Sequence, residues 1–468
     1  MKSIPPRFDR GSFRDRSSRV FYQDGRVCRY LDAGALKEWD SLSTSPLYPR
    51  LLAMKRIGST HRVEVNPETL KPPWVAVLEH DRIPFISYPY EWSFGMLQDA
   101  AAAHLDLISA ALEEDFILRD CSPFNIQWTG ARPLFIDIPS FALHQSGEVW
   151  AGYQQFCRTF LYPLLFQAYK GIAFQRWLRS LLEGIPAEEM TRLFSWWEFF
   201  RPGLLADVFL EARLERSWAK TERTIRTEMR DAGFPKEFIL KNVRRLLGIV
   251  RGLRVKRHES EWSDYANERN YSPEDYAAKK EFVKSVCARR SWDLAWDLGC
   301  NTGDFSLIAA DHASCVVAMD ADDGVVENLY RRLKTAQDTR VLPLVMNLAD
   351  PSPAQGWAGR ERKSLTSRGK PDLVMALALL HHLVIGANVP LADAVAWLAS
   401  LGAELVVEFV GKEDSMVQRL LLNREDIFTD YDRPHFEALL ETHYRVEKKI
   451  PLVQGGRWLY HAVPKSTA

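Results

Sequence analysis

The sequence has no long apolar run and little cysteine. Nowhere do about 18 apolar residues follow one another without interruption, and the polar, proline-interrupted N-terminus lacks the apolar core of a secretory signal. The 6 cysteines among 468 residues include no C-x-x-C pair and no histidine partner at zinc-ligand spacing. These absences predict a cytoplasmic protein with reduced cysteines, and they argue against a membrane span, a disulfide framework and a cysteine-based zinc site.

The chain also lacks an excess of charge of either sign. Its 61 lysine and arginine residues balance 61 aspartate and glutamate residues, so no overall field attracts it to nucleic acid or to an anionic membrane. The helical region before residue 258 is rich in basic residues but has no interleaved aromatics that could stack on bases. A solvated helix face is therefore favoured over a nucleic-acid surface.

The order of the predicted elements divides the chain into three parts. Short β-type runs flank the hairpin-like pair Asp24 and Gly25, and an alanine-rich helix is expected over 96–112. The aromatic run 193–200 is interpreted as core packing. From residue 292 strands alternate with helices, which is typical of a parallel α/β sheet. The five strands are expected over 293–298, 315–319, 341–345, 372–376 and 404–410. We predict a first domain over 1–205, a helical connector over 206–259 and a C-terminal domain over 260–468.

A glycine-containing turn follows the first strand of the C-terminal domain. Residues 297–303 read DLGCNTG, and glycines at 299 and 303 allow a ligand to approach the backbone closely. The next strand ends in Asp320, which places a carboxylate where a ribose diol would lie. The spacing is not the G-x-G-x-x-G of a dinucleotide site, and Asp304 would repel pyrophosphate but tolerate a cationic sulfonium. The pattern predicts a nucleoside site.

Residues 297–303 resemble the acidic-x-Gly-x-Gly-x-Gly motif of class I methyltransferases that depend on S-adenosylmethionine (SAM). Asn301 replaces the middle glycine, a change that a left-handed backbone tolerates. The resemblance implies an α/β, Rossmann-like domain over 260–468 that ends in an antiparallel strand pair near 444–450 and 457–463. It implies cofactor contacts from Asp297, Gly299, Cys300, Asn301, Gly303, Asp320, Asn347 and Leu348.

Three further residues are candidates for contact with the methyl group and its acceptor. His381 and His382 follow the fourth predicted strand and Glu408 lies in the fifth, where the resemblance implies that the acceptor binds. A histidine pair at a strand end is also a common packing element. Tyr271 lies in an aromatic segment beginning at Trp262 that either covers the cofactor as a lid or packs an entry helix.

The implied activity is methyl transfer from SAM to an oxygen or nitrogen acceptor. Residues 342–344, 350–357, 381–383 and 408–410 resemble a bacterial subgroup of methyltransferases that includes NoeA-like nodulation proteins. Because acceptor contacts lie on variable loops, the sequence does not identify the acceptor, and we expect a small molecule or carbohydrate rather than a macromolecule. A non-catalytic SAM-binding protein remains the alternative.

The first domain contains a second, weaker resemblance. Asp120, Asn125 and Asp137 have the spacing of the catalytic loop and metal-binding segment of protein kinase-like and aminoglycoside phosphotransferase-like α+β folds. This implies that Asp120 orients a hydroxyl while Asn125 and Asp137 hold Mg²⁺ with ATP. Leu118 stands where histidine is usual, and a glycine-rich phosphate loop is missing. The alternatives are an active phosphotransferase in a bifunctional enzyme, a kinase-derived module for substrate binding or regulation, and an unrelated fold. Asp120 and Asn125 would also have this spacing if they only braced a loop through Asx hydrogen bonds.

Overall fold

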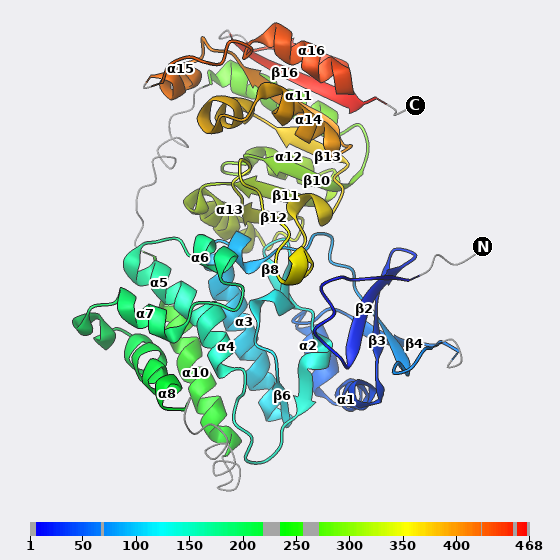
Figure 1. The fold of residues 1–468 in the computed structure, drawn as a ribbon. Coiled ribbons are helices and arrows are strands. Elements are labelled where there is room, and N and C mark those ends of the chain that lie inside the picture. The colour runs from blue at the N-terminus through cyan, green and yellow to red at the C-terminus, as the bar shows by residue number, and fades with distance from the viewer. Residues whose placement is uncertain are drawn as a thin grey trace.

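The structure, a computed structural model, describes residues 6–66, 70–218, 235–255, 271–422, 424–452 and 456–465. The chain folds into two halves that pack against each other (Figure 1). The N-terminal half contains an antiparallel sheet and many helices, and the C-terminal half is built around a seven-stranded sheet. Within the described residues, no helix combines the length and apolar character needed to cross a bilayer.

The N-terminal sheet has five strands in the order β1-β2-β3-β5-β4. The predicted hairpin is confirmed: β2 and β3 pair antiparallel, and Asp24 (φ 50°) and Gly25 (φ 79°) between them both have the left-handed backbone of a type I′ turn. The strands are β1 (Arg7–Phe8), β2 (Ser18–Gln23), β3 (Arg26–Leu31), β4 (Thr60–Val63) and β5 (Ala76–His80).

Helix α3 (Phe94–Glu113) forms the centre of the N-terminal half and confirms the predicted alanine-rich helix. Its first turn is capped by the Ser93 hydroxyl, which accepts from the Met96 amide. Two small antiparallel strand pairs, β6–β9 and β7–β8, follow it. These strands are β6 (Phe116–Leu118), β7 (Ile126–Thr129), β8 (Arg132–Phe135) and β9 (Phe141–Leu143), and the other helices of this half are α1 (Ala33–Ser43), α2 (Leu47–Ala53), α4 (Tyr153–Phe156), α5 (Tyr162–Lys170), α6 (Gln175–Ser180), α7 (Ala187–Leu193), α8 (Glu211–Trp218) and α10 (Lys236–Gly252).

The described part of the predicted connector packs into the N-terminal half. Helix α10 lies along α3, and the Gln98 side-chain amide donates to the carbonyls of Val250 (2.7 Å) and Leu253 (3.0 Å). The Arg245 guanidinium binds the fully buried Asp207 carboxylate in two hydrogen bonds. Residues 206–218 and 235–255 therefore extend the first domain rather than link two domains. The aromatic segment beginning at Trp262 lies outside the described residues.

The interpretation of residues 193–200 as core is wrong for most of its rings. Trp196, Trp197 and Phe200 are 71%, 61% and 78% exposed. The reason is local, because the Glu198 carboxylate binds the Ser195 amide and the Lys170 ammonium (2.9 and 2.7 Å). The acid thus turns inward and the short 3₁₀ helix presents its aromatic rings to solvent.

The C-terminal sheet has the order β12-β11-β10-β13-β14-β16-β15, with five parallel strands and an antiparallel pair at one edge. The five predicted parallel strands and the predicted antiparallel pair are confirmed within two residues. The strands are β10 (Trp292–Leu298), β11 (Ala313–Asp320), β12 (Val341–Val345), β13 (Leu373–Ala376), β14 (Glu404–Val410), β15 (Tyr444–Pro451) and β16 (Arg457–Pro464), and the helices are α11 (Pro273–Cys287), α12 (Asp304–Ala310), α13 (Asp323–Ala336), α14 (Leu391–Ser400), α15 (Ser415–Leu421) and α16 (Arg433–His443).

The chain order in this sheet reverses at β10, whose neighbours are β11 on one side and β13 on the other. In open α/β sheets a ligand binds outside the carboxyl ends of the strands at such a reversal, because loops diverge there and leave a crevice. The sheet therefore places the glycine turn after β10, the end of β11 and the end of β13 around one crevice.

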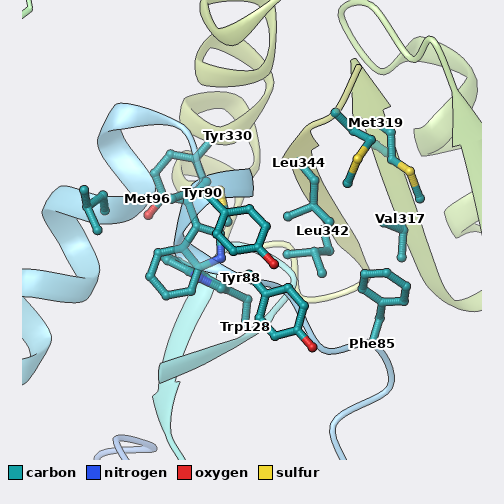
Figure 2. Packing of buried hydrophobic residues seen from close by; sticks show 14 of the residues in the cluster. Phe85, Tyr88, Tyr90, Met96, Trp128, Val317, Met319, Tyr330, Leu342 and Leu344 are labelled. Atoms are coloured by element: carbon teal, nitrogen blue, oxygen red, sulfur yellow. The ribbon is translucent and has the colours of Figure 1, made fainter. Parts of the chain in front are cut away.

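The two halves share one hydrophobic core. Figure 2 shows aromatic rings of the N-terminal half against β11, β12 and α13. Phe85 packs edge-on against Trp296 with ring centroids 6.0 Å apart, and Trp128 packs edge-on against Tyr330 at 5.7 Å. Such burial of apolar surface contributes about 25 cal/mol per Å². The halves are thus docked through a continuous apolar interface.

Candidate functional site

A cavity of about 780 Å³ opens at the carboxyl edge of β10, β11 and β13. This volume is within the usual range for small-molecule sites. The cavity brings together most of the residues predicted from the sequence, and Arg424, Arg457, Lys279 and Met346 join them. The predicted residues in its lining are Tyr271, Asp297, Gly299, Cys300, Asn301, Asp320, Asn347, Leu348, His381 and His382.

The turn after β10 has the left-handed backbone conformation that glycines favour. Gly299, Asn301 and Gly303 all have left-handed φ angles, of 77°, 47° and 80°. Asn301, the departure from the glycine motif, is a residue type that adopts this conformation readily. Gly303 is not in the cavity lining but begins α12, where an added Cβ would lie 2.5 Å from the Leu329 side chain. The turn thus keeps its shape without the middle glycine.

Asp320 joins this turn to the end of the neighbouring strand. One carboxylate oxygen accepts from the Asn301 amide (2.9 Å) and the other from the Asp322 amide (3.1 Å). Burial raises the pKa of Asp320, and these two amides oppose the shift. The carboxylate lines the cavity, and these two bonds fix its orientation.

Two acids stabilise the start of α12. The Ser306 hydroxyl donates to the buried Asp297 carboxylate (2.6 Å), and burial raises the pKa of Asp297 to about 6. Burial also acts to raise the pKa of Asp304, but a hydrogen bond from the Tyr276 hydroxyl (2.5 Å) and the Arg332 ion pair (3.1 Å) outweigh it and lower that pKa. Asp304 therefore stays ionised in the cavity wall.

The loop after β12 forms another wall of the cavity. Residues 346–349 all line it, and the Met346 amide donates to the Asp320 carbonyl (2.7 Å). The Asn347 side-chain oxygen accepts from the Ala349 amide (3.0 Å) and so stabilises its own turn. This arrangement places Asn347 and Leu348 beside the Asp320 end of the cavity.

A buried ion cluster lies behind Tyr271. The Glu408 carboxylate contacts the Lys279 ammonium (2.6 Å) and the Arg457 guanidinium (3.3 Å), and it accepts from the Tyr271 hydroxyl (2.8 Å). Burial lowers the pKa of Lys279, but Glu408 and Tyr271 together outweigh that effect and the net shift is upward. Burial raises the pKa of Tyr271 to about 12. Glu408 itself is fully buried and is not among the residues that line the cavity.

His381 and His382 also line the cavity, with ring centroids 4.2 Å apart. His381 is 2% exposed, and its Nδ1 has no hydrogen-bond partner among the described residues. Burial lowers the pKa of both rings, and the nearby Arg457 cation adds to the effect. Both imidazoles are therefore neutral at neutral pH, the form that can accept a proton.

Sequence reasoning assigned no site role to Arg457 or Lys279. Lys279 is on α11, and Arg457 is on β16, which lies between β14 and the edge strand β15 and places Arg457 opposite Val410 of β14. Neither residue belongs to a local motif, since each meets Glu408 only through the packing of elements far apart in the chain. The one feature of the sequence that indicated a buried ion cluster was Glu408, a charged residue inside an otherwise apolar strand.

The polar residues of the N-terminal half contact other partners. One Asp120 oxygen accepts from the Ser122 amide (2.9 Å), and the Asp137 carboxylate pairs with the Arg29 guanidinium (2.9 Å). Burial raises the pKa of Asp137, whereas Arg29 opposes the shift. Within the described ranges no three His, Cys, Asp or Glu side chains are placed to hold a metal ion. The arrangement around Asp120, Asn125 and Asp137 thus gives no support for ATP and Mg²⁺, and the Asp120 contact is that of an Asx-braced loop.

Comparison with known proteins shows which proteins this chain is related to. No family model matches the chain. The "Nodulation protein NoeA" of Rhizobium meliloti (strain 1021) is 36% identical over 454 residues, which cover 96% of this chain and 94% of that protein.

Solved methyltransferase structures match a smaller share of the chain. N-methyltransferase NodS from Bradyrhizobium japonicum WM9, in complex with S-adenosyl-L-homocysteine (SAH), is 11% identical, with a TM-score of 0.32, and the match covers 44% of this chain and 100% of that one. Magnesium protoporphyrin IX methyltransferase (ChlM) from Synechocystis PCC 6803 with bound SAH is 16% identical, with a TM-score of 0.31, over 44% and 95%. From its identity to NoeA along nearly its whole length, the chain belongs to the family of the nodulation protein NoeA, and the motif and strand order make its C-terminal half SAM-dependent methyltransferase-like.

Proposed function

We propose that this protein transfers a methyl group from SAM to an oxygen or nitrogen atom of a small-molecule or carbohydrate acceptor. The observation that carries the proposal is the single cavity that connects the glycine turn and Asp320 with His381 and His382. The lining of this cavity combines groups that suit a nucleoside with two neutral imidazoles. The N-terminal half then acts in substrate binding or regulation.

The lining of the cavity fits SAM. Asp320 offers carboxylate oxygens for ribose hydroxyls, and residues 346–349 offer a partly apolar wall for the adenine. The ionised Asp304 gives the turn a negative charge that favours a sulfonium. When bound, SAM supplies a methyl group that is already activated by its positive sulfur. The chain therefore has to align the acceptor with it, and alignment of this kind contributes on the order of 7–11 kcal/mol.

Within this proposal Glu408 is a positioning residue. Two buried cations neutralise it, so its role is to hold the Tyr271 hydroxyl and the Lys279 ammonium at the cavity wall. The Lys279 ammonium also donates to the Tyr271 hydroxyl (2.9 Å). Tyr271, fixed by both neighbours, then bounds the space in which the cofactor lies. The proton-accepting role falls to His381, whose Nδ1 lacks a partner among the described residues.

His381→Ala is expected to lower kcat by about 10² to 10⁴ with a hydroxyl acceptor, the usual contribution of a general base. SAM affinity should stay nearly unchanged. His382→Ala is the matched control, because it removes the adjacent ring from the same wall. The measurement is SAH release under saturating substrates. A His381→Ala enzyme with the wild-type kcat would remove His381 from the mechanism.

The pH dependence of kcat/KM follows from the lowered pKa values of the two histidines. Burial, His382, Arg457 and Lys279 all disfavour the protonated form of His381, so the base remains neutral until the pH falls below the ordinary value of about 6.5. We expect a flat rate from neutral pH down to that value and a decline only at more acidic pH. A decline centred above pH 7 would show that another group acts as the base.

Calorimetric titration of the full chain with SAM tests the cofactor site, and SAH formation with pools of small molecules and oligosaccharides tests catalysis. Saturable binding with acceptor-dependent SAH release supports the proposal. Binding without SAH release from any pool would favour the alternative, a non-catalytic SAM-binding protein. Absence of binding by the folded chain would contradict both readings.

A further inference from the structure

We infer that the N-terminal half completes the cofactor site by anchoring residues 346–352, and that Arg179 and Glu91 are the positioning residues that do so. The inference rests on the proposed function, because it takes the cavity beside Met346 to be the SAM site. It assigns the N-terminal half a role in the methyltransferase itself, separate from acceptor binding and from phosphotransfer.

Residues 346–352 contact both the cavity and the N-terminal half. Residues 346–349 line the cavity, whereas Asp350 and Ser352 contact the N-terminal half. The segment lies outside any helix or strand of the sheet. Its backbone bonds to the rest of its own half are at its two ends, from the Met346 amide to the Asp320 carbonyl and from the Leu365 amide to the Ser352 carbonyl. A loop with few contacts samples many conformations, and a ligand that orders it binds more weakly.

Arg179, near the end of α6, binds residues 350 and 351 of this segment. Its guanidinium donates to both carboxylate oxygens of Asp350 (2.9 and 3.0 Å) and to the Asp350 carbonyl (3.0 Å). It also donates to the Pro351 carbonyl (3.3 Å). A bidentate guanidinium–carboxylate pair fixes orientation as well as distance. One side chain of the N-terminal half therefore holds both the side chain and the backbone of the loop.

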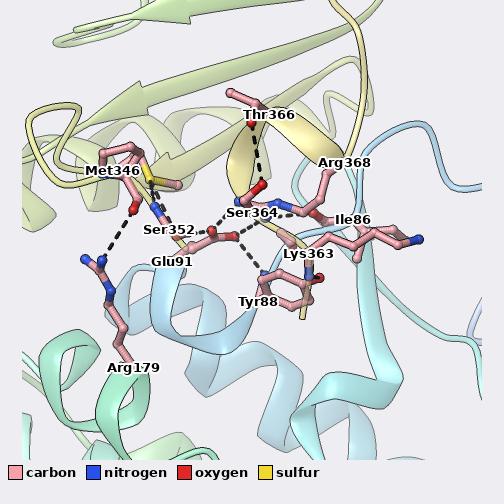
Figure 3. A network of polar contacts seen from close by, with 12 residues as sticks. Ile86, Tyr88, Glu91, Arg179, Met346, Ser352, Lys363, Ser364, Thr366 and Arg368 are labelled. Atoms are coloured by element: carbon pink, nitrogen blue, oxygen red, sulfur yellow. Dashed lines mark hydrogen bonds and ion pairs between the residues drawn. The ribbon is translucent and has the colours of Figure 1, made fainter. Parts of the chain in front are cut away.

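Glu91 holds the far end of the loop from within the interface (Figure 3). Its carboxylate is 1% exposed, accepts from the Ser352 hydroxyl (2.5 Å) and forms two bonds of 2.6 Å with the Arg368 guanidinium. The Ser352 amide and hydroxyl in turn lie 3.4 and 3.6 Å from the Met346 sulfur. A continuous set of contacts thus runs from Glu91 through Ser352 to a residue in the cavity wall.

The test uses full-length Arg179→Ala, because Arg179 is partly exposed and its loss leaves the core intact. We expect the Kd for SAM and for SAH to rise about three- to tenfold, the range typical of contacts that couple two sites. Arg179→Lys should recover part of the affinity, since one charged contact remains. Amide hydrogen exchange in 346–352 should accelerate without ligand. Lys334→Ala is the matched control, because the Lys334–Asp99 pair also crosses the interface but does not touch this loop.

Unchanged affinity and unchanged exchange in Arg179→Ala would overturn the inference. The same weakening in Lys334→Ala would overturn it too, because the effect would then be a general loosening of the interface. If the wild-type chain does not bind SAM, that result contradicts the proposed function and does not test the anchoring. In that case faster exchange confined to 346–352 still supports the anchoring by Arg179, and unchanged exchange overturns it.

Discussion

Asp320→Ala is expected to abolish SAM binding that calorimetry can detect, a loss of at least about 100-fold. Hydrogen bonds to a charged group contribute about 1.5–3 kcal/mol each, and a ribose diol would make two with this carboxylate. The substitution also removes the acceptor of the hydrogen bonds that the Asn301 and Asp322 amides now donate to this carboxylate. The glycine turn therefore loses its fixed position.

Two comparisons make the Asp320 result specific. Asp320→Asn keeps the size and one acceptor oxygen but not the charge, and it should bind SAM at an intermediate level. Asp311→Ala removes an exposed acid after α12 that pairs with Arg340, away from the cavity lining, and should leave affinity unchanged. Wild-type affinity in a folded Asp320→Ala protein would show that the cofactor does not use this strand end.

Glu91→Gln is expected to destabilise the protein by about 3–5 kcal/mol, because it leaves a buried guanidinium without its counter-charge. The Arg368 side chain is fully buried and the Glu91 side chain is 1% exposed. Burial lowers the pKa of Arg368, but Glu91 with Tyr88 and Tyr90 outweighs that effect and the net shift is upward, so Arg368 stays charged. The measurement is the midpoint of urea unfolding, followed by far-UV circular dichroism.

The exposed cross-interface pair Lys334–Asp99 supplies the control for this loss of stability. Lys334→Ala should cost less than about 1 kcal/mol, since solvent screens a surface pair. Replacing both buried partners, as Glu91→Leu with Arg368→Met, should recover part of the stability lost in the single variant. A Glu91→Gln midpoint equal to that of the wild type would mean that water already reaches Arg368.

The sequence predicted the parts of the site that follow one another along the chain. The apolar strand before residue 298, the DLGCNTG turn and the acid at the end of the next strand form a local pattern, and the parallel sheet has to bring their ends to the same edge. The strand limits agree within two residues because buried parallel strands are short, apolar and bounded by turns.

Two interpretations could not be settled from local pattern. The aromatic run 193–200 has the composition of a core segment, yet Glu198 binds Lys170 and turns Trp196 and Trp197 outward. The charged helix α10 was expected to be a connector, yet Val243 and Val250 pack on α3 at full burial. In both cases the deciding contact comes from another element, which hydropathy within the segment does not report.

By itself, then, the sequence determined the α/β sheet, the glycine turn and the carboxylate of Asp320, because neighbours along the chain specify them. Only the tertiary structure decided that Lys279, Glu408 and Arg457 form one cluster and that Glu91 meets Arg368, 277 residues further along the chain. Such pairs leave no periodic trace in the sequence, since the partners lie on elements far apart along the chain. The Glu91–Arg368 pair is buried where the two halves dock, whereas the Glu408 cluster is buried by packing within the C-terminal half.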